Sequence, residues 1–191
     1  MKYLSIFLLL FSFLTSATAQ TKNILMIVAP VEFRDEELFI HKKIFEDNGY
    51  KVEVASKPTE AGKAKGVGGA EIGVDLLLEK ARFGKYDAIV IVGGPGANIY
   101  WQDKDVLTLI KDARQNKKII GAICIAPVCL ANAGILEGKR ATAFASEAQK
   151  LTKKGAQYVA VNVVADDGII TADGPFESEE FAYKILEELQ K

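Results

Sequence analysis

Strand-like and helix-like segments alternate along the chain, and this alternation restricts the fold more than any other feature of the sequence. Three continuous apolar runs, at residues 23–29, 87–92 and 117–124, have the composition of strands that are buried on both faces. Segments 35–49 and 104–116 lie between these runs and carry apolar residues at helical spacing. Repeated βα units predict an α/β fold, with a mainly parallel sheet and helices on both of its faces.

The remaining segments extend this pattern and add no second domain. They comprise a strand at 51–56, a short helix at 127–134, a helix near 146–154, a hairpin at 157–172 turning at 166–168, and an amphipathic helix at 178–190. The glycine- and lysine-rich stretch 57–71 is interpreted as a loop or a loose hairpin. We therefore predict a single flavodoxin-like sandwich domain at residues 20–191.

Residues 1–19 have the pattern of a cleaved signal peptide. Lys2 precedes an apolar stretch that is too short to span a membrane comfortably. Ala17 and Ala19 then occupy the small-residue positions that signal peptidase recognises. This pattern favours export to a periplasm or to the outside of the cell, with no membrane attachment after cleavage. An uncleaved membrane anchor is the alternative.

The signal-peptide interpretation predicts that the mature protein begins at Gln20. Intact-mass measurement of the exported protein should give a chain that lacks residues 1–19. A mature chain that retains Met1 would instead indicate the membrane anchor.

Charge and motif content exclude several classes of partner. The formal net charge is −1 with acids and bases interspersed, so there is no basic stripe for nucleic acid. The first strand–helix turn contains no glycine, and the chain has neither a G-x-G-x-x-G nor a G-K-[ST] motif for nucleotide phosphates. We expect no cofactor and no metal ion.

The stretch GAICIAP, residues 121–127, places Cys124 where a strand ends and a helix begins. Sites in open α/β sheets form outside the carboxyl ends of strands. Gly121 and Ala126 are small enough for a sharp turn, and the helix starting at Pro127 directs N–H groups and a positive dipole toward the sulfur. Such surroundings lower a thiol pKa and favour the thiolate. The alternative interpretation is a small buried hydrophobic residue.

The second cysteine, Cys129, lies inside the short helix and is interpreted as core filling. Its position five residues after Cys124 at the start of a helix is poor geometry for a disulfide between the two. The two cysteines are therefore expected to be free and to differ in reactivity.

Two further segments bring candidate groups to the same edge of the sheet. Gly93 and Gly94 end the neighbouring strand, and their amides could form an oxyanion hole with the amide of Ile125. Glu36 and Glu37 open the first helix, and the strand before it can lie beside the one that carries Cys124.

Together the stretches FRDEELF, VIVGGPGA, GAICIAPVCLANAGIL and GIITADGPFESEEFA resemble the ThiJ/PfpI superfamily, part of the class I glutamine amidotransferase-like folds. The resemblance implies that Cys124 is the reactive cysteine and that Glu37 contacts it. It also implies that Gly94 and Ile125 supply the oxyanion amides, and it indicates Gly93 and Pro175 as residues lining the site. Homodimers are usual among small members, so a homodimer is expected.

Histidines set this chain apart from some members of that superfamily. Members compared with peptidases carry a histidine directly after the cysteine, where this chain has Ile125. Members with glyoxalase or deglycase activity usually have a histidine near the following strand, where this chain has Phe144. His41, the only histidine, lies one turn after Glu37 and is interpreted as an ordinary helix residue.

Two functions remain open on this basis. In the first, the Cys124 thiolate attacks a reactive carbonyl and Glu37 shuttles the proton. In the second, the protein has no turnover and responds to an oxidant, with Cys124 oxidised to sulfinic acid. Peptidase activity is less favoured because no histidine follows Cys124.

Overall fold

A seven-stranded sheet forms the centre of the computed structural model, which describes residues 22–191; the predicted signal peptide and Gln20 lie outside the described residues. The strand order is β11-β12-β8-β7-β1-β3-β6, and every neighbouring pair is parallel except the β11–β12 hairpin. The strands are β1 (Asn23–Ile27), β3 (Lys51–Ser56), β6 (Leu76–Leu77), β7 (Ala88–Ile91), β8 (Ile119–Ile123), β11 (Val163–Asp166) and β12 (Ile169–Ala172). The predicted mainly parallel sheet is confirmed.

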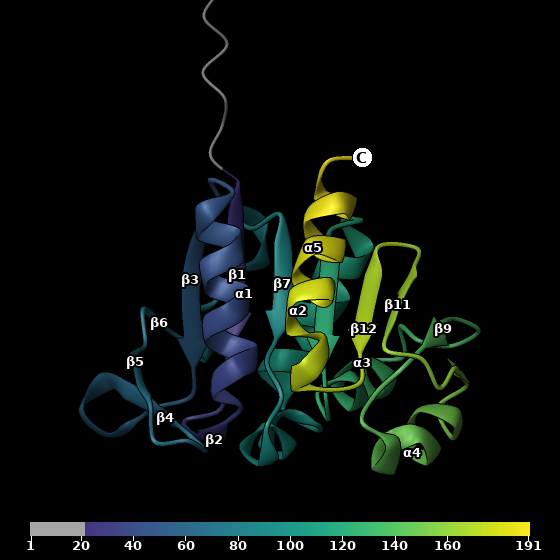
Figure 1. The fold of residues 1–191 in the computed structure, drawn as a ribbon, viewed down its shortest axis with the longest axis horizontal. Coiled ribbons are helices and arrows are strands. Elements are labelled where there is room, and N and C mark those ends of the chain that lie inside the picture. The colour runs from purple at the N-terminus through teal and green to yellow at the C-terminus, as the bar shows by residue number, and fades with distance from the viewer. Residues whose placement is uncertain (1–21) are drawn as a thin grey trace, which may run out of the picture.

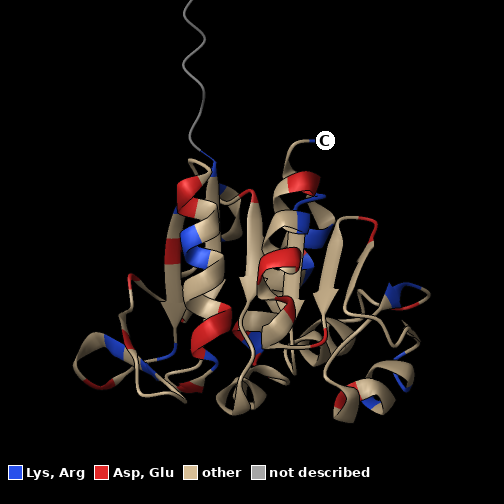
Figure 2. Cartoon of the chain, in the orientation of Figure 1, with Lys and Arg blue, Asp and Glu red and all other residues tan. Residues whose placement is uncertain are grey.

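Helices cover both faces of this sheet, as the alternating pattern predicts (Figure 1). On the face toward the viewer, α1 (Asp35–Asp47) packs beside α5 (Ser178–Leu189). The opposite face carries α2 (Lys104–Gln115) and α3 (Pro127–Asn132), with α4 (Ala148–Thr152) packed against α3. Figure 2 shows acidic residues, coloured red, at the first turns of α1 and α5, where their charge complements the positive ends of the helix dipoles.

Each central strand feeds two separate hydrophobic cores because successive side chains point to opposite faces of a sheet. In β1, Leu25 and Ile27 face the core built with α2 and α3. Ile24 and Met26 face the core built with α1 and α5, which contains Phe181. The uninterrupted apolar runs in the sequence follow directly from burial on both sides.

Two small sheets lie at the edges of the domain. The stretch interpreted as a loop or loose hairpin contains β4 (Lys63–Gly66), which pairs antiparallel with β5 (Glu71–Gly73) and parallel with the unexpected β2 (Val31–Phe33). Strand β9 (Arg140–Ala141) pairs with β10 (Gln157–Tyr158). Such short strands carry too few residues to show an alternating pattern in the sequence.

The expectation that the first strand can lie beside the strand of Cys124 is wrong. Strand β7 stands between β1 and β8. The loop at Gly93 and Gly94, which follows β7, therefore lies between the first turn of α1 and the end of β8. Within residues 22–191, no helix is long and apolar enough to cross a membrane.

Candidate functional site

Cys124 occupies a sharp corner directly after β8. Its φ angle of 61° lies in the left-handed region, which a non-glycine residue adopts only when its surroundings hold it there. The Cys124 N–H donates to the carbonyl of Ala172 over 2.9 Å, and the Cys124 carbonyl accepts from Phe144 N–H over 2.9 Å. Both neighbouring segments thus hold the turn, and the predicted corner is present.

The structure gives a reason for a glycine at position 121 that differs from the sharp turn expected there. A Cβ atom at this position would lie 2.7 Å from Cδ1 of Ile185 and 2.8 Å from Cζ of Phe181. The absence of a side chain lets α5 pack closely against β8, three residues before the corner itself.

Glu37 reaches Cys124 across the end of β7. Its side chain is fully buried, and the Gly93 N–H donates to Oε2 over 2.7 Å. A Cβ atom on Gly93 would lie 2.6 Å from Cβ of Cys124 and 2.8 Å from Oε2 of Glu37. The other carboxyl oxygen, Oε1, has no hydrogen-bond partner among residues 22–191. The bare glycine therefore allows the carboxyl group and the cysteine to lie together.

Burial raises the pKa of both groups. It raises the pKa of Glu37 to about 7, against the lowering effects of the Gly93 N–H, the Arg34 charge and the Cys124 thiol. Burial, and then the negative charge of Glu37, raise the pKa of Cys124 to about 11, although the N–H groups of Gly94 and Ile125 act to lower it. The two groups titrate as a pair, which holds one proton between about pH 7 and about pH 11.

The structure does not support the expected lowering of the Cys124 pKa by the following helix. Helix α3 is only six residues long, so it has few peptide dipoles to add. The Cys124 residue is 6% exposed, and the loss of hydration penalises its thiolate more than the nearby N–H groups stabilise it. Between about pH 7 and about pH 11 the proton therefore stays mainly on the sulfur, with the Glu37 carboxylate beside it.

The predicted oxyanion residues lie next to the sulfur. Gly94 has a φ angle of 94°, and its N–H and that of Ile125 are placed so that both lower the pKa of the Cys124 thiol. The Ile125 N–H shares its peptide unit with the Cys124 carbonyl, which accepts from Phe144 N–H over 2.9 Å, and this bond holds the donor in orientation. Two fixed N–H donors at a nucleophile are the elements of an oxyanion hole.

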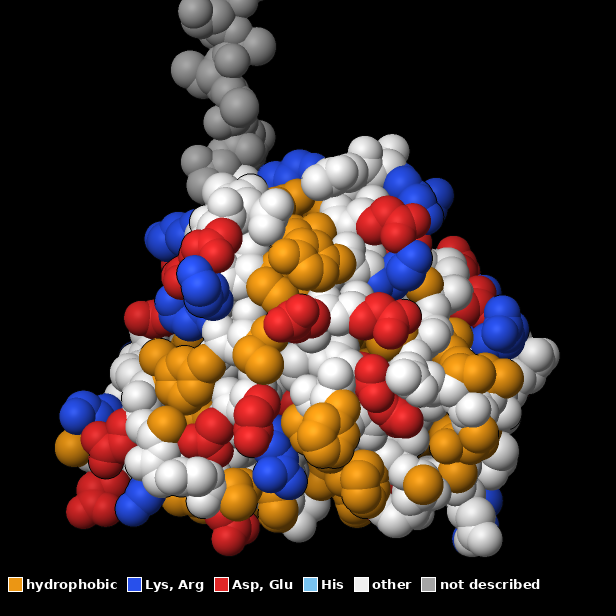
Figure 3. Space-filling model, viewed as in Figure 1, with side chains coloured by type: hydrophobic (Ala, Val, Ile, Leu, Met, Phe, Trp, Pro, Cys, Tyr) orange, Lys and Arg blue, Asp and Glu red, His pale blue; other side chains and the backbone are white. Residues whose placement is uncertain are grey.

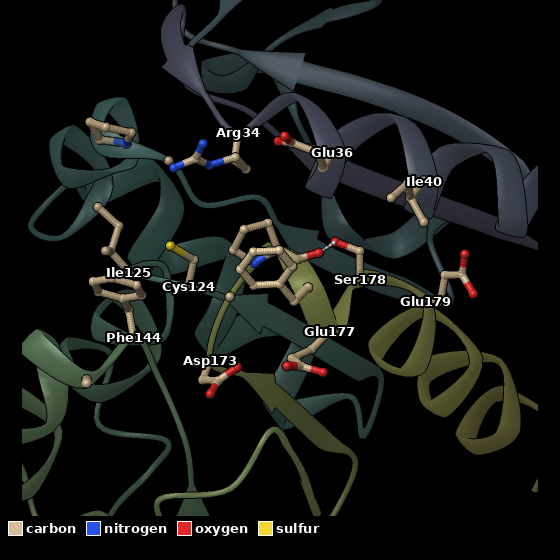
Figure 4. Close-up of a pocket in the computed structure, with 16 residues that line it drawn as sticks. Arg34, Glu36, Ile40, Cys124, Ile125, Phe144, Asp173, Glu177, Ser178 and Glu179 are labelled. Atoms are coloured by element: carbon tan, nitrogen blue, oxygen red, sulfur yellow. Dashed lines mark hydrogen bonds between the residues drawn. The ribbon is translucent and has the colours of Figure 1, made fainter. Parts of the chain in front are cut away.

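A cavity of about 880 Å³ opens over Cys124 (Figure 4). Pro175 lines it as predicted, whereas Gly93 lies behind the cysteine and is not part of the wall. Phe144, whose ring is half exposed, forms part of one wall. The cavity thus reaches from Cys124 to the segment before α5, where the exposed Phe176 marks its mouth.

Several cavity residues are missed by sequence reasoning. They are Arg34, Ile40, Asp173 and Glu177. The acids stand in the segment 173–177 between β12 and α5, and their only signal in the sequence is that they follow a predicted strand at the carboxyl edge of the sheet. Within residues 22–191, no cluster of three or more potential ligands is arranged to hold a metal ion.

His41 lies outside this cavity. Its ring is fully buried between helices, with its centroid 5.0 Å from that of Phe181 and 6.3 Å from that of Phe45. Neither ring nitrogen has a hydrogen-bond partner in the described part of the chain. Burial lowers the pKa of His41 to about 3, so the ring is neutral. His41 is an ordinary helix residue, as the sequence predicts.

We expect His41 to make the protein sensitive to acid. A histidine whose pKa is lower in the folded state contributes stability above its unfolded value of about 6.5, and this contribution is lost as the pH falls toward 3. The loss should be on the order of 4 kcal/mol. A His41→Leu variant should therefore unfold at lower pH than the wild type when circular dichroism is followed during acid titration. Equal midpoints would contradict a buried neutral histidine.

The two cysteines are both free and differ in access. Cys124 lines the cavity, whereas Cys129 is fully buried in α3, where burial raises its thiol pKa to about 12. Limited iodoacetamide treatment should modify Cys124 at least about ten times faster than Cys129, because a closed core position is protected from the reagent. Peptide mapping measures the two rates. Equal modification of the two would contradict the assignment of the site.

Comparison with known proteins identifies the family. A family model described as the DJ-1/PfpI family matches residues 22–188. The chain is 42% identical over 172 residues to an uncharacterised protein from Methanocaldococcus jannaschii, covering 88% of this chain and 83% of that relative. It is 32% identical over 172 residues to the glutathione-independent glyoxalase DJR-1.2 of Caenorhabditis elegans, covering 90% and 91%.

A solved structure agrees with these sequence matches. The ThiJ/PfpI domain protein from Brachyspira murdochii superposes with a TM-score of 0.86 at 36% identity, covering 90% of this chain and 98% of that one. The predicted resemblance to the ThiJ/PfpI superfamily is confirmed. Since the family model spans nearly all described residues and both relatives match along most of their length, the chain belongs to the DJ-1/PfpI family.

Proposed function

We propose that the protein acts on reactive carbonyl compounds through Cys124, in glyoxalase- or deglycase-like chemistry. One observation carries this proposal: the buried carboxyl group of Glu37, held by the Gly93 N–H, lies beside a cysteine that faces a cavity. The similarity to a relative named as a glyoxalase adds support.

In the proposed reaction, Glu37 takes the thiol proton as the Cys124 sulfur bonds to a carbonyl carbon. The electron pair of the C=O bond moves to oxygen, and the N–H groups of Gly94 and Ile125 stabilise the oxyanion. The proton held by Glu37 then passes to that oxygen, which gives a hemithioacetal. For a 2-oxoaldehyde, transfer of the C1 proton to C2 gives a thioester. Water hydrolyses the thioester to a 2-hydroxy acid and restores the thiol.

Turnover of methylglyoxal tests this proposal. The wild type should convert methylglyoxal to lactate, and a Cys124→Ala variant should show no conversion above the uncatalysed rate. A Cys129→Ala variant is the matched control and should retain turnover, because Cys129 lies in the core of α3. Conversion that survives Cys124→Ala would exclude the cysteine mechanism.

The lack of histidine in the described cavity favours a second function, a redox-responsive protein without turnover. In this case a peroxide oxidises Cys124 twice, each step adding one oxygen atom to sulfur and releasing one water, to sulfinic acid. A protonated Glu37, whose Oε1 has no partner among the described residues, could donate to a sulfinate oxygen. Two equivalents of peroxide should add two oxygen atoms to the Cys124 peptide. This result, in a protein that does not turn over methylglyoxal, would favour the second function.

Export and homodimerisation form part of the same proposal. Export rests on the pattern of residues 1–19, and the homodimer rests on membership of the family. Light scattering of the mature protein at micromolar concentration should give the mass of two chains. A monomer would count against the homodimer.

A further inference from the structure

The segment 173–177 brings two acids and an aromatic ring to the mouth of the cavity. Asp173 follows β12, and Glu177 ends the single turn Pro175–Glu177 that leads into α5. Phe176 lies between them, and 96% of it is exposed. All three line the cavity over Cys124. The segment therefore places an apolar surface between two carboxyl groups beside the reactive sulfur.

The carboxyl groups at this mouth are unpaired. Neither Asp173 nor Glu177 makes an ion pair or a side-chain hydrogen bond within residues 22–191, although ion pairs are common elsewhere on the surface. Both residues are half-buried. The pKa of Asp173 is raised, mainly by burial and to a smaller extent by the negative charge of Glu177. Two partly dehydrated carboxylates that repel one another leave a place where a positive charge would be stabilised.

The opposite charge lies at the other side of the sulfur. Among residues 22–191, Arg34 is the one basic residue lining the cavity, which also has Glu36 and Glu179 in its wall. The positive charge of Arg34 is close enough to Cys124 and Glu37 to lower the pKa of both. In Figure 4, Arg34 lies on one side of Cys124, and Asp173 and Glu177 lie on the other. Acidic and hydrophobic side chains also gather over the N-terminal ends of α1 and α5 in the space-filling view (Figure 3). The cavity wall therefore carries a positive charge at Arg34, on one side of the sulfur, and negative charges at its mouth.

Two further observations show that this cavity is built for a ligand. Cys124 presents its thiol to it from a strained backbone conformation. The fully buried Glu37 beside that thiol keeps one carboxyl oxygen without a partner among the described residues. The volume of about 880 Å³ also leaves ample room for a molecule larger than a three-carbon dicarbonyl.

We propose that segment 173–177 selects carbonyl substrates that carry a positive charge and disfavours anionic ones. The carbonyl oxygen points inward, toward Arg34 and the N–H groups at Cys124. The cationic end, an ammonium or a guanidinium group, lies against the ring of Phe176 between Asp173 and Glu177, where cation–π attraction adds to the attraction of the carboxylates. The conversion of such substrates rests on the proposed function, whereas the preference for a positive charge does not.

Three arylglyoxals that differ only in the para substituent test the inference by turnover. The substituents are trimethylammonium, hydrogen and carboxylate, and each rate is divided by the rate of the same compound with a small thiol in solution. We expect the normalised kcat/KM to favour the cationic compound over the anionic one by about tenfold, equivalent to about 1.4 kcal/mol. An Asp173→Asn/Glu177→Gln double variant should lose most of this preference. Glu180→Gln removes a negative charge from the exposed surface of α5, outside the cavity lining, and as the control it should keep the preference.

A labelling experiment separates failure of this inference from failure of the proposed function. Cationic and anionic methanethiosulfonates modify Cys124 without any turnover, and the ratio of their rates reports the local charge. We expect the wild-type ratio to exceed that of a small thiol and to fall in the double variant. A wild-type ratio that equals the small-thiol value, or a ratio that is unchanged in the double variant, overturns the inference. A ratio that responds while all three arylglyoxals remain unconverted supports the inference and contradicts the catalytic proposal.

Discussion

A Gly93→Ala variant is expected to lose nearly all reactivity at Cys124. The added methyl group would lie 2.6 Å from Cβ of Cys124, 2.8 Å from Oε2 of Glu37 and 2.8 Å from the carbonyl oxygen of Ile123. No side chain at these positions can move away freely, because Glu37 is fully buried and Cys124 is held at both its N–H and its carbonyl. The substitution must therefore separate the carboxyl group from the thiol.

The expected size of this effect follows from both packing and chemistry. Overpacking of a buried site costs about 1–3 kcal/mol of folding stability. Loss of the Glu37 contact removes the proton acceptor, which is worth about a hundredfold or more in rate. Alkylation of Cys124 at neutral pH and turnover of methylglyoxal should both fall at least a hundredfold.

Gly84→Ala is the matched control for this substitution. Gly84 has an ordinary negative φ angle and no atom within 4 Å of the position of an added Cβ. It should retain wild-type alkylation and unfold at the wild-type urea concentration. A Gly93→Ala protein that alkylates at the wild-type rate would show that Glu37 and Cys124 do not need their observed contact.

Most of the fold could be predicted because burial on both faces leaves a strong trace in the sequence. Strand β3 occupies residues 51–56, the range predicted for it, and β7 and β8 lie within their predicted ranges. The hairpin of β11 and β12 could be predicted from Asp167 and Gly168, which both adopt positive φ angles at its turn. Short edge strands such as β2 could not, since pairing with a distant segment decides their conformation.

The site was harder to predict than the fold. The corner at Cys124 follows from local residue sizes and strand position, so the sequence indicates it. The contact with Glu37 depends on strand order, which placed β7 and Gly93 between the two residues. Burial of the thiol depends on how surrounding segments close over it, and this reversed the expected direction of its pKa.

The pH dependence of Cys124 alkylation should change markedly in a Glu37→Gln variant. In the wild type, the pair of Cys124 and Glu37 loses its first proton with a pKa of about 7. Above this pH the remaining proton can sit on Glu37, which leaves a thiolate, so the rate should rise through pH 7. In the variant, only the thiol titrates. Removal of the Glu37 charge lowers its pKa below about 11, but burial still holds it above the ordinary value.

The variant should therefore lack the rise near pH 7, because no carboxyl group is left to take the thiol proton, and its rate should rise only as the thiol itself ionises, above about pH 9. Glu36→Gln removes the same charge from the same helical turn while leaving the pair intact. It should keep the rise, displaced slightly to lower pH, because the charge of Glu36 raises the pKa of Glu37.

The most direct test is the rate of Cys124 alkylation by iodoacetamide between pH 5 and pH 11, measured in a Cys129→Ala background. Its pH dependence reports whether Glu37 takes the thiol proton. The predicted result is a rise centred near pH 7 in the protein with Glu37, and a single rise above pH 9 in the Glu37→Gln protein. A Glu37→Gln protein that keeps the rise near pH 7 would show that Cys124 ionises without Glu37. That result would contradict the shared-proton mechanism at the centre of the proposed function.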